Sequence, residues 1–390
     1  MGEQTLRVGM VGYAFMGATH SLGWRNAPRF FDLPWGVELT AVVGRNAAAV
    51  EAARHRFGFA TAETDWRSLL ERDDIDLIDI CTPGDTHAEI AIAALRDGKH
   101  VLCEKPLANT VAEAEEMVAA ATEAAARGVF AMCGFTYRRT PALAYARTLI
   151  EQGRLGTVRQ VRGQYLQDWL HDENAPMTWR LDKSRSGSGA LGDIGAHLID
   201  TTQWLLGQPI TGVSALLETF VTTRPISGEM SGLGGVGSAD APRAAVTVDD
   251  AALFSARFAD GAIGSFEATR FALGRKNAFR VEVNGTQGSV AFDFEDNNVL
   301  EFFDGTDPTA EQGFRRIVVT EPEHPYLAAW WPPGHGLGYE HGFTHQVVDL
   351  VTALAAGTQP TPSFADGCQV QQVLAAVEAS ADTHSAWTSV

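Results

Sequence analysis

The sequence predicts two differently built parts, an α/β part on a parallel sheet followed by an α+β part on a mostly antiparallel open sheet. Up to about residue 140, apolar strand-like runs alternate with helix-like runs, an order typical of parallel strands joined by helices. Beyond about residue 156, strand-like runs follow one another with turn residues between them and little helix. Because 390 residues exceed one ordinary core, we expect two domains, residues 1–140 and 141–390.

In the first domain, the expected strands and helices alternate strictly. The strands are Leu6–Val11, Val37–Val43, Ile75–Cys81, His100–Cys103 and Val129–Phe135. The helices are Ala47–Phe57, His87–Asp97, Val111–Ala126 and one that follows a glycine turn after the first strand. Right-handed crossovers between such strands bring their carboxyl ends to one edge of the sheet.

In the second domain, we expect fewer helices and more hairpins. Val158–Gln167 has strand composition, and Asp193–Leu206 has helical spacing and ends at Gly207. Several strands are expected between 211 and 303, and the Gly- and Ser-rich residues 227–242 are expected to form a long loop. The chain ends in helices at Tyr339–Ala356 and Phe364–Ser380, whose packing against the first domain the sequence leaves open.

Composition excludes some classes of function. The formal net charge is −18, so a surface that binds nucleic acid is disfavoured. No run of 18 apolar residues predicts a membrane span, and the first ten residues lack the basic and apolar regions of a signal peptide. The four cysteines form no CxxC pair, which favours buried, reduced thiols. We therefore expect a cytoplasmic protein.

The first turn carries a pattern typical of dinucleotide binding. It contains Gly12, Ala14, Phe15, Met16 and Gly17, and it lies between a strand and a helix, as the G-x-G-x-x-G motif of a Rossmann domain requires. Glycines allow the backbone to approach a pyrophosphate, and the helix N-terminus supplies N–H donors. Ala14 replaces the second glycine, and its methyl group reduces the space in which the backbone can approach the pyrophosphate. A purely structural turn is the alternative, but the βαβ series that follows favours a cofactor site.

The end of the second strand bears on the choice between NAD and NADP. An acidic residue for the ribose hydroxyls of NAD is expected there, but the sequence has Gly44, Arg45 and Asn46. Arg45 would suit a 2′-phosphate, so the sequence slightly favours NADP over NAD. In the alternative interpretation, Arg45 stacks on the adenine or points into solvent.

Three further motifs carry a family resemblance. Cys81-Thr82-Pro83 ends a strand and is followed by His87, Glu104-Lys105-Pro106 ends the next strand, and Gly189–Asp200 reads GALGDIGAHLID. In this order they resemble the Gfo/Idh/MocA oxidoreductase family over essentially the whole chain. Shorter segments, such as residues 137–141, 165–169 and 363–367, resemble the levoglucosan dehydrogenase-type members. The resemblance implies an NAD(P)-dependent enzyme that oxidises a ring hydroxyl of a sugar, anhydrosugar or polyol.

The resemblance also implies a catalytic set of Lys105, Asp193 and His197. Lys105 ends a parallel strand, where ligands gather, and a lysine there can take up a proton and stabilise charge on oxygen. Asp193, His197 and Asp200 are spaced to share one helix face, and His197 can accept a proton near neutrality. Surface exposure, helix capping and ordinary burial are the alternatives for these residues. We assign Asp200 mainly to structure.

The remaining site residues complete the expectation. Cofactor contacts are expected from Thr82, Pro83, His87, Glu104 and Lys105, in addition to the glycine turn. The substrate residues expected by position are Tyr137, Gln167, Trp169, Trp179, Arg180 and Tyr339, although each of these types is more often a packing residue. His335, His341 and His345 do not form a metal motif, so we expect no metal.

Two other functions compete with a dehydrogenase. A redox-neutral glycosidase of the same family would oxidise its substrate only transiently, and a nucleotide-sensing protein of the same fold would not react at all. The presence of Lys105, Asp193 and His197 together favours an enzyme. A mostly stranded second domain leaves one sheet face to be covered, so we expect a homodimer or homotetramer.

Overall fold

The computed structural model describes residues 4–226, 228–231, 234–238 and 240–390, and the chain forms two compact units. The first unit comprises Met1–Arg139 and Gly338–Cys368, and the second comprises Thr140–Leu337 and Gln369–Val390. A segment far along the chain thus belongs to the same unit as the N-terminal residues.

The first unit contains a six-stranded sheet in the order β3-β2-β1-β4-β5-β6, and every neighbouring pair is parallel. The strands are β1 (Thr5–Val11), β2 (Gly36–Val43), β3 (Thr61–Glu63), β4 (Leu77–Ile80), β5 (His100–Cys103) and β6 (Ala131–Cys133). The order reverses beside β1, so the strand ends of β1 and β4 flank a topological switch point, where ligands bind in such sheets. The predicted parallel sheet is confirmed.

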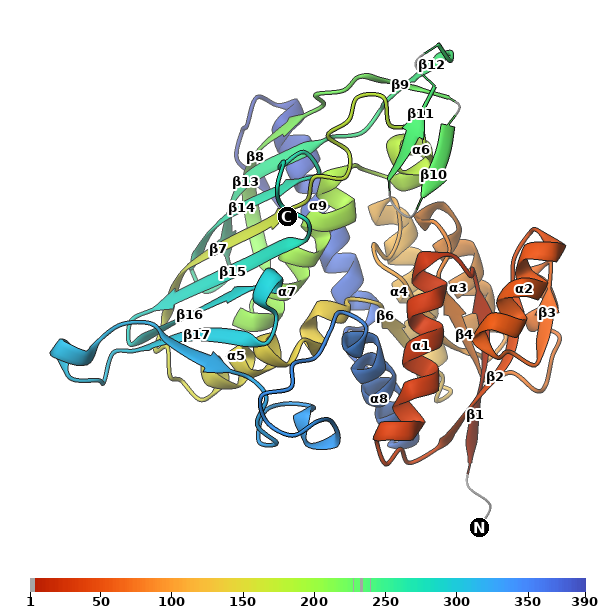
Figure 1. Ribbon diagram of the computed structural model, residues 1–390, viewed down its shortest axis with the longest axis horizontal. Helices are drawn as coiled ribbons and strands as arrows, with labels where there is room; N and C mark the ends of the chain where they lie inside the picture. The colour runs from red at the N-terminus through yellow and green to blue at the C-terminus, as the bar shows by residue number, and fades with distance from the viewer. Residues whose placement is uncertain (1–3, 227, 232–233, 239) are drawn as a thin grey trace. The chain divides into compact units, whose positions relative to one another are not determined.

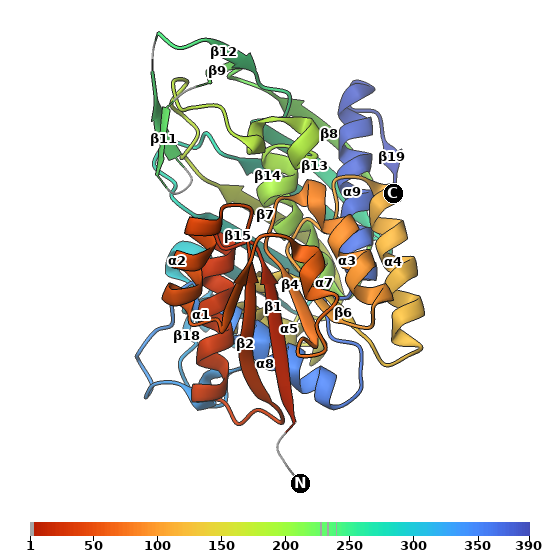
Figure 2. The same cartoon turned by 90° about the vertical axis from the view of Figure 1, so that its right-hand side faces the viewer.

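Helices cover both faces of this sheet. Figure 2 shows α1 and α2 on one side and α3 and α4 on the other, and α8 packs against α1. Their bounds are α1 (Phe15–Phe30), α2 (Ala47–Phe57), α3 (His87–Arg96), α4 (Val111–Ala125) and α8 (His341–Ala355), with short 3₁₀ helices η1 (Trp66–Leu69), η2 (Gly84–Thr86) and η3 (Thr136–Arg139). Because both faces are covered, all four residues of β4 are buried, as is usual for a parallel sheet.

The core of the first unit includes residues from both ends of the sequence. Trp24 of α1 belongs to the same buried cluster as Val347, Leu350 and Val351 of α8. The helical spacing of these three residues turns one face of α8 toward α1. Helix α8 is therefore part of the layer that covers the N-terminal sheet.

The second unit is built on a nine-stranded sheet in the order β18-β17-β16-β15-β7-β14-β13-β8-β19 (Figure 1). Its strands are β7 (Val158–Leu166), β8 (Ile210–Glu218), β13 (Ala251–Phe258), β14 (Ile263–Thr269), β15 (Ala278–Gly285), β16 (Gly288–Asp293), β17 (Val299–Asp304), β18 (Arg315–Val318) and β19 (Thr388–Ser389). The β7–β14 pair is parallel and the other described pairs are antiparallel. The predicted mostly antiparallel sheet is confirmed.

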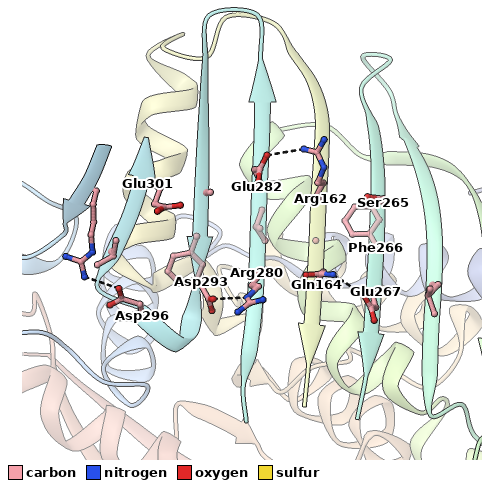
Figure 3. A pocket seen from close by; sticks show the side chains of 17 residues that line it. Arg162, Gln164, Ser265, Phe266, Glu267, Arg280, Glu282, Asp293, Asp296 and Glu301 are labelled. Carbon is pink, nitrogen blue, oxygen red and sulfur yellow. Dashed lines mark hydrogen bonds and ion pairs between the residues drawn. The ribbon is translucent and has the colours of Figure 1, made fainter. Parts of the chain in front are cut away.

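One face of this sheet packs against α5 and α7. The helical elements of this unit are α5 (Pro141–Glu151), η4 (Trp179–Leu181), α6 (Lys183–Ser186), η5 (Leu191–Gly195), α7 (Ala196–Leu206), η6 (Phe294–Asp296), η7 (Thr309–Glu311) and η8 (Leu327–Ala329), and α9 spans Phe364–Asp382. Figure 3 shows the opposite face, where polar side chains line a hollow of about 710 Å³ with helices behind the sheet. The strands alternate accordingly, with Val161, Gly163 and Tyr165 buried and Arg162 exposed on β7.

The stretch predicted as a long loop contains short strands instead. Within residues 227–242, β10 (Gly228–Ser231) pairs with β11 (Gly234–Gly237), and just outside them β9 (Thr223–Pro225) pairs with β12 (Arg243–Ala245). Residues 227, 232, 233 and 239 of that stretch lie outside the described residues. In β10 and β11, strand pairing overrides the weak strand propensity of glycine and serine. None of the described helices has the length and apolar character that a bilayer crossing needs.

Candidate active site

The glycine turn after β1 can be built only with glycine at two positions. Gly12 has φ +99°, and a Cβ there would lie 2.8 Å from the carbonyl oxygen of Cys81. A Cβ on Gly17 would lie 2.2 Å from the carbonyl oxygen of Gly12. The turn and α1 therefore approach each other closely, which leaves the backbone exposed at the point where a dinucleotide phosphate would lie.

The N-terminus of α1 fits an anion. Ala14 is the N-cap residue, with φ −71° and ψ −154°, a conformation that an alanine adopts without strain. This explains how the turn tolerates a residue other than the second glycine of the motif. Among the described residues no side chain caps this helix end, and its first turn holds no acid. The first N–H groups, at Phe15, Met16 and Gly17, therefore suit a pyrophosphate.

The other predicted cofactor residues follow neighbouring strands of the same sheet. Arg45 follows β2 and is exposed, Thr82 and Pro83 follow β4, and Lys105 follows β5 and is partly buried. Backbone bonds hold these ends together, from Gly12 N to Val43 O at 3.0 Å and from Cys81 N to Val11 O at 2.8 Å. The structure thus brings the predicted cofactor residues to one edge of the parallel sheet.

The aromatic ring of Tyr13 covers the residue before Arg45. A Cβ on Gly44 would lie 1.9 Å from Cε1 of Tyr13, so only glycine leaves room for this ring. The end of β2 is therefore lined by an aromatic ring and followed by one exposed arginine. Sequence reasoning missed Tyr13, whose position is a variable one in the glycine motif.

His87 joins the turn after β4 to the turn after β5. Its Nε2 lies 2.8 Å from the carbonyl oxygen of Thr82, and its Nδ1 lies 3.0 Å from the carbonyl oxygen of Pro106. The ring therefore contacts one carbonyl oxygen in each of the two turns. The side chain of this buried residue therefore fixes the segment that carries Lys105.

A chain of buried charges lies next to Lys105. His20 Nδ1 lies 2.9 Å from Asp79 Oδ1, and His20 Nε2 lies 2.9 Å from Glu104 Oε1. Trp24 Nε1 donates to Asp79 Oδ2 at 2.7 Å. All four side chains are buried. Glu104 therefore directs its carboxylate into the protein, and sequence reasoning missed His20, Trp24 and Asp79 because nothing local distinguishes them from core residues.

In the second unit, Asp193 and His197 lie on a helix that begins as a π-turn. The segment η5, Leu191–Gly195, is π-helical and continues into α7. Within Leu191–Thr202, all of which is described, Asp193 and His197 alone are partly exposed, and Asp200 is buried. The predicted regular helix from Asp193 is wrong in its first turn, although both polar side chains do reach the surface. π-turns are rare and concentrate at functional sites.

Asp249 holds the start of this helix from a neighbouring segment. Its two carboxylate oxygens accept hydrogen bonds from the backbone N–H groups of Gly189 and Leu191, each at 2.7 Å. Burial raises the pKa of Asp249, while the nearby Arg270 and these N–H groups oppose that shift. Arg270 is fully buried, and its Nη1 lies 3.6 Å from Asp193 Oδ2. Asp249 and Arg270 therefore fix the position and charge surroundings of Asp193.

Polar groups suited to a sugar extend from His197. The Tyr165 ring lies 5.9 Å from that of His197, and the Tyr165 hydroxyl donates to Asn277 Oδ1 at 2.8 Å. Gln167 Nε2 donates to the same oxygen at 2.7 Å, and Trp169 Nε1 donates to Gln167 Oε1 at 2.9 Å. The structure thus connects predicted Gln167 and Trp169 with Tyr165 and Asn277, which sequence reasoning did not single out as site residues.

The other predicted substrate residues have different surroundings. Trp179 and Arg180 lie on η4, where the Arg180 guanidinium stacks on the Trp179 ring at 4.5 Å from its centroid. Tyr137 and Tyr339 belong to the first unit. The Tyr339 ring stacks on Phe15, with centroids 6.2 Å apart and an angle of 5° between the planes. Both rings are substantially exposed, at 49% for Phe15 and 36% for Tyr339, so they form an aromatic surface beside the first turn of α1.

A backbone group contacts the ring of each of three histidines, His335, His341 and His345. His335 Nδ1 lies 2.8 Å from Pro332 O, and His341 Nδ1 accepts from Gly338 N at 3.0 Å. His345 Nδ1 lies 2.9 Å from Arg139 O, and burial lowers the pKa of His345 to about 3. These contacts account for the i, i+4 histidine pair as part of the packing of α8.

The fold and these two groups of residues define an oxidoreductase with a Rossmann domain. Residues 6–132 match the family described as "Oxidoreductase family, NAD-binding Rossmann fold", and residues 143–291 match the "GFO/IDH/MocA C-terminal domain". The chain belongs to the Gfo/Idh/MocA oxidoreductase family, and it is an enzyme that acts on CH–OH groups with a nicotinamide cofactor.

Several relatives match the whole chain. Levoglucosan dehydrogenase of Pseudarthrobacter phenanthrenivorans is 43% identical, with 99% of this chain and 98% of that protein covered. An oxidoreductase domain protein from Kribbella flavida is 62% identical, with a TM-score of 0.94 and 99% of both chains covered. A structure of levoglucosan dehydrogenase in complex with NADH and levoglucosan is 41% identical, with a TM-score of 0.92, and covers 99% of this chain and 100% of that chain.

Proposed function

We propose that this enzyme oxidises a ring hydroxyl of a sugar, anhydrosugar or polyol, with levoglucosan as the first substrate to test. The observation that carries the proposal is the pairing of two partly exposed groups, Asp193 and His197, with a polar chain of Tyr165, Gln167 and Trp169 in one unit. Flat aromatic surfaces beside hydrogen-bonding groups are what sugar rings require. The full-length similarity to levoglucosan dehydrogenase supports the same substrate class.

We propose that residues 1–140 bind the cofactor and that residues 141–390 supply the substrate-binding domain. Gly12, Gly17 and the first turn of α1 would hold the pyrophosphate. Arg45, Thr82, Pro83, His87, Glu104 and Lys105 would surround the rest of the cofactor, by direct contact or by supporting the turns that make contact. When bound, the nicotinamide takes up the hydride that leaves the substrate carbon.

For the identity of the cofactor, we propose NAD. The sequence-based preference for NADP rests on Arg45, whereas the similar levoglucosan dehydrogenase structures hold NADH. Arg45 is exposed and follows the Tyr13-covered Gly44, so it remains the residue that would contact a 2′-phosphate if one were present.

We propose the catalytic roles as follows. As the C–H bond breaks, the substrate hydroxyl loses its proton either to His197, while the ammonium of Lys105 stabilises charge on the oxygen, or to the neutral amine of Lys105, which thereby becomes the ammonium that stabilises this charge. Asp193 orients the hydroxyl and His197. Gln167 and Trp169 bind the sugar, and Tyr137, Trp179, Arg180 and Tyr339 are the further substrate residues of this proposal.

We also propose a homodimer or homotetramer formed through the face of the nine-stranded sheet opposite α5 and α7. On that face Leu253 lies opposite Leu216 in the strand register, and these side chains are 48% and 63% exposed. The same face also carries both signs of charge, since Arg162 forms an ion pair with Glu282 (Figure 3). Light scattering at micromolar concentration tests this, and a monomer would contradict it. The four buried thiols support a reducing, cytoplasmic setting.

The experiment that tests the function is a substrate panel. Levoglucosan, aldoses, glycosides and inositols are each supplied with NAD or NADP, and the absorbance of the reduced cofactor is followed. We expect reduction of NAD with at least one sugar, and its loss in Lys105→Met with cofactor binding retained. Glycoside cleavage without net cofactor reduction would instead identify a redox-neutral enzyme, and normal turnover of folded Lys105→Met would remove the lysine from the catalytic set.

A further inference from the structure

The buried chain of Asp79, His20 and Glu104 connects α1 with the ends of β4 and β5. Each nitrogen of the His20 ring faces a carboxylate oxygen at 2.9 Å. Asp79 also accepts the indole N–H of Trp24 at 2.7 Å, and the Phe343 ring lies 5.4 Å from that of His20. The His20 ring therefore has a carboxylate partner on each side.

The partners determine the charge of His20. Ionised carboxylates only accept hydrogen bonds, so the ring satisfies both of them by donating from both nitrogens, which makes it an imidazolium. Burial alone lowers the pKa of His20, but the charge and hydrogen bond of Asp79, together with the interactions with Cys81, outweigh burial and place the pKa well above the ordinary value. Without this cation, two carboxylates would be buried together without compensation, which is strongly unfavourable.

Glu104 transmits this arrangement to Lys105. Its Oε1 is held by His20, and its Oε2 accepts the backbone N–H of Lys105 at 3.2 Å. Gly134 leaves the space that the carboxylate needs, because a Cβ there would lie 2.8 Å from Glu104 Oε1. The Glu104 side chain is therefore fixed at both oxygens, one on the buried cation and the other on the backbone of the residue that follows.

We propose that His20 is a positioning residue for Lys105, acting through the Glu104 carboxylate that it holds against the lysine backbone. The inference rests on the proposed catalytic role of Lys105. His20 touches neither substrate nor cofactor in this proposal. It determines the direction in which the Lys105 side chain extends from the end of β5. A displacement of about 1 Å in a catalytic group lowers the rate by up to about 10²-fold.

A metal ion is the competing interpretation of this cluster. Ligand atoms of His20, Asp79 and Cys81 lie within 4.8 Å of one another. However, burial raises the pKa of Cys81, which disfavours the thiolate that a metal would need. Hydrogen bonds already occupy both nitrogens of His20, so the direct chain is favoured. Stoichiometric zinc or another transition metal in the purified wild-type enzyme would overturn the proposal.

Two substitutions at His20 separate its two contacts. The amide nitrogen of asparagine reaches the position of Nδ1, so His20→Asn keeps a donor toward Asp79 and loses the one toward Glu104. The amide nitrogen of glutamine reaches the position of Nε2, so His20→Gln keeps the donor toward Glu104 and loses the other. Both variants remove the same positive charge, which makes them matched controls for each other.

We expect His20→Asn to lower kcat by about 10- to 100-fold, with the dissociation constant for NADH unchanged. His20→Gln should retain a kcat close to that of wild type. Thermal unfolding should show comparable destabilisation in both variants. Equal kcat values in the two variants would overturn the proposal, because a merely structural histidine would not distinguish them. If Lys105→Met retains turnover, the proposed function of Lys105 fails instead, whatever the His20 variants do.

A second pair of variants applies if the His20 variants do not fold. Glu104→Asp shortens the carboxylate so that it cannot reach both His20 and the Lys105 backbone, whereas Trp24→Phe removes a donor to Asp79 only. We expect kcat to fall in Glu104→Asp and to stay near wild type in Trp24→Phe. His345→Gln, at another buried histidine of the same unit, controls for the general effect of losing a buried ring. A fall in kcat in Trp24→Phe equal to that in Glu104→Asp would overturn the proposal.

Discussion

Lys105 belongs to the first unit, whereas Asp193 and His197 belong to the second. In each unit, a buried carboxylate accepts backbone hydrogen bonds from the segment that carries these residues. Glu104 accepts the backbone N–H of Lys105, and Asp249 accepts those of Gly189 and Leu191 at the start of the helix that carries Asp193. Each carboxylate has a buried cation nearby, His20 for Glu104 and Arg270 for Asp249. The proposed catalytic side chains at a strand end and at a helix start are thus held through their backbones.

The two regions differ in how tightly the cation is engaged. His20 has a carboxylate within hydrogen-bonding distance of each nitrogen, whereas Arg270 approaches Asp193 at 3.6 Å and donates to the carbonyl oxygen of Asp249 at 3.1 Å. Arg270 Nε and Nη1 have no hydrogen-bond partner among the described residues. At the strand end, His20 is therefore held by hydrogen bonds to a carboxylate on each side. At the helix start, Arg270 interacts with the Asp193 carboxylate at a longer distance, mainly through its charge.

The largest expected effect is at His197. His197→Ala should lower the oxidation rate by roughly 10²–10⁴-fold, the range for a lost general base. The wild-type rate should also fall on the acid side of its pH profile, because a protonated ring cannot accept the hydroxyl proton, and this limb should disappear in the variant. Initial rates from pH 5 to 9 provide the measurement. A small loss with the limb intact would assign proton removal to Lys105 and leave His197 a positioning role.

The next largest effect is expected at Asp249, whose carboxylate binds the backbone at the start of the helix. Asn at position 249 has one acceptor oxygen in place of two, so Asp249→Asn leaves one of the N–H groups of Gly189 and Leu191 unsatisfied. We expect a loss of about 1–3 kcal/mol in the free energy of unfolding, and a fall in kcat because the π-turn that carries Asp193 is loosened.

Asp250→Asn is the matched control, since Asp250 is also buried and its Oδ2 accepts the backbone N–H of Val221 at 3.0 Å, while its Oδ1 has no hydrogen-bond partner among the described residues. An asparagine there keeps the bond. Urea unfolding and steady-state rates compare the two variants. If Asp250→Asn reduces kcat as much as Asp249→Asn, the hold on Gly189 and Leu191 is not what positions Asp193.

A smaller effect is expected at Arg45. If this side chain contacts a 2′-phosphate, Arg45→Asp should lower kcat/KM with NADP by about 10- to 100-fold, equivalent to the 1.5–3 kcal/mol of a charged hydrogen bond, and should spare NAD. The ratio of the two efficiencies is the measurement. An unchanged ratio would show that Arg45 does not read the phosphate.

The smallest effect compares two buried histidines by stability. The pKa of His20 is raised in the folded protein, so its stabilising contribution is present below its unfolded pKa near 6.5 and is lost as pH rises through the folded value. The pKa of His345 is lowered to about 3, so its contribution is lost instead as pH falls from about 6.5 toward 3. The unfolding free energy is measured between pH 5 and 9 for wild type, His20→Gln and His345→Gln. The difference between wild type and variant should decrease with rising pH for His20→Gln and increase with rising pH for His345→Gln. Slopes of the same sign would mean that His20 is not charged between Asp79, Cys81 and Glu104.

Local patterns in the sequence predicted much of the fold. Alternation of apolar strands with helices predicted the parallel sheet, and the glycine motif located the turn at Gly12. The motif around Lys105 and the one around Asp193 and His197 identified groups that lie at a strand end and at the surface of a buried helix. These signals are local because each depends on neighbouring residues or on a fixed short spacing.

What the sequence did not predict depends on contacts between distant residues. Asp249 is 60 residues from Gly189, and His20 is 84 residues from Glu104. A buried carboxylate or histidine has no local pattern that distinguishes it from an exposed one. The π-turn at Leu191–Gly195 was also missed, because its sequence is equally compatible with a regular α-helix. Strand pairing decided the structure of the glycine-rich residues 228–231 and 234–237.

The π-turn has a consequence for comparing this chain with others. A π-turn holds one more residue than the α-turn it replaces, since its hydrogen bonds join residues five apart rather than four. A homologue with an ordinary α-turn there would have one residue fewer between the counterparts of Gly189 and His197. An alignment would then need a gap, and placing it one position away would pair Asp193 with the counterpart of Gly192 or of Ile194. Deleting a single residue within Leu191–Gly195 would therefore preserve a helix and still change which side chain occupies the position of Asp193.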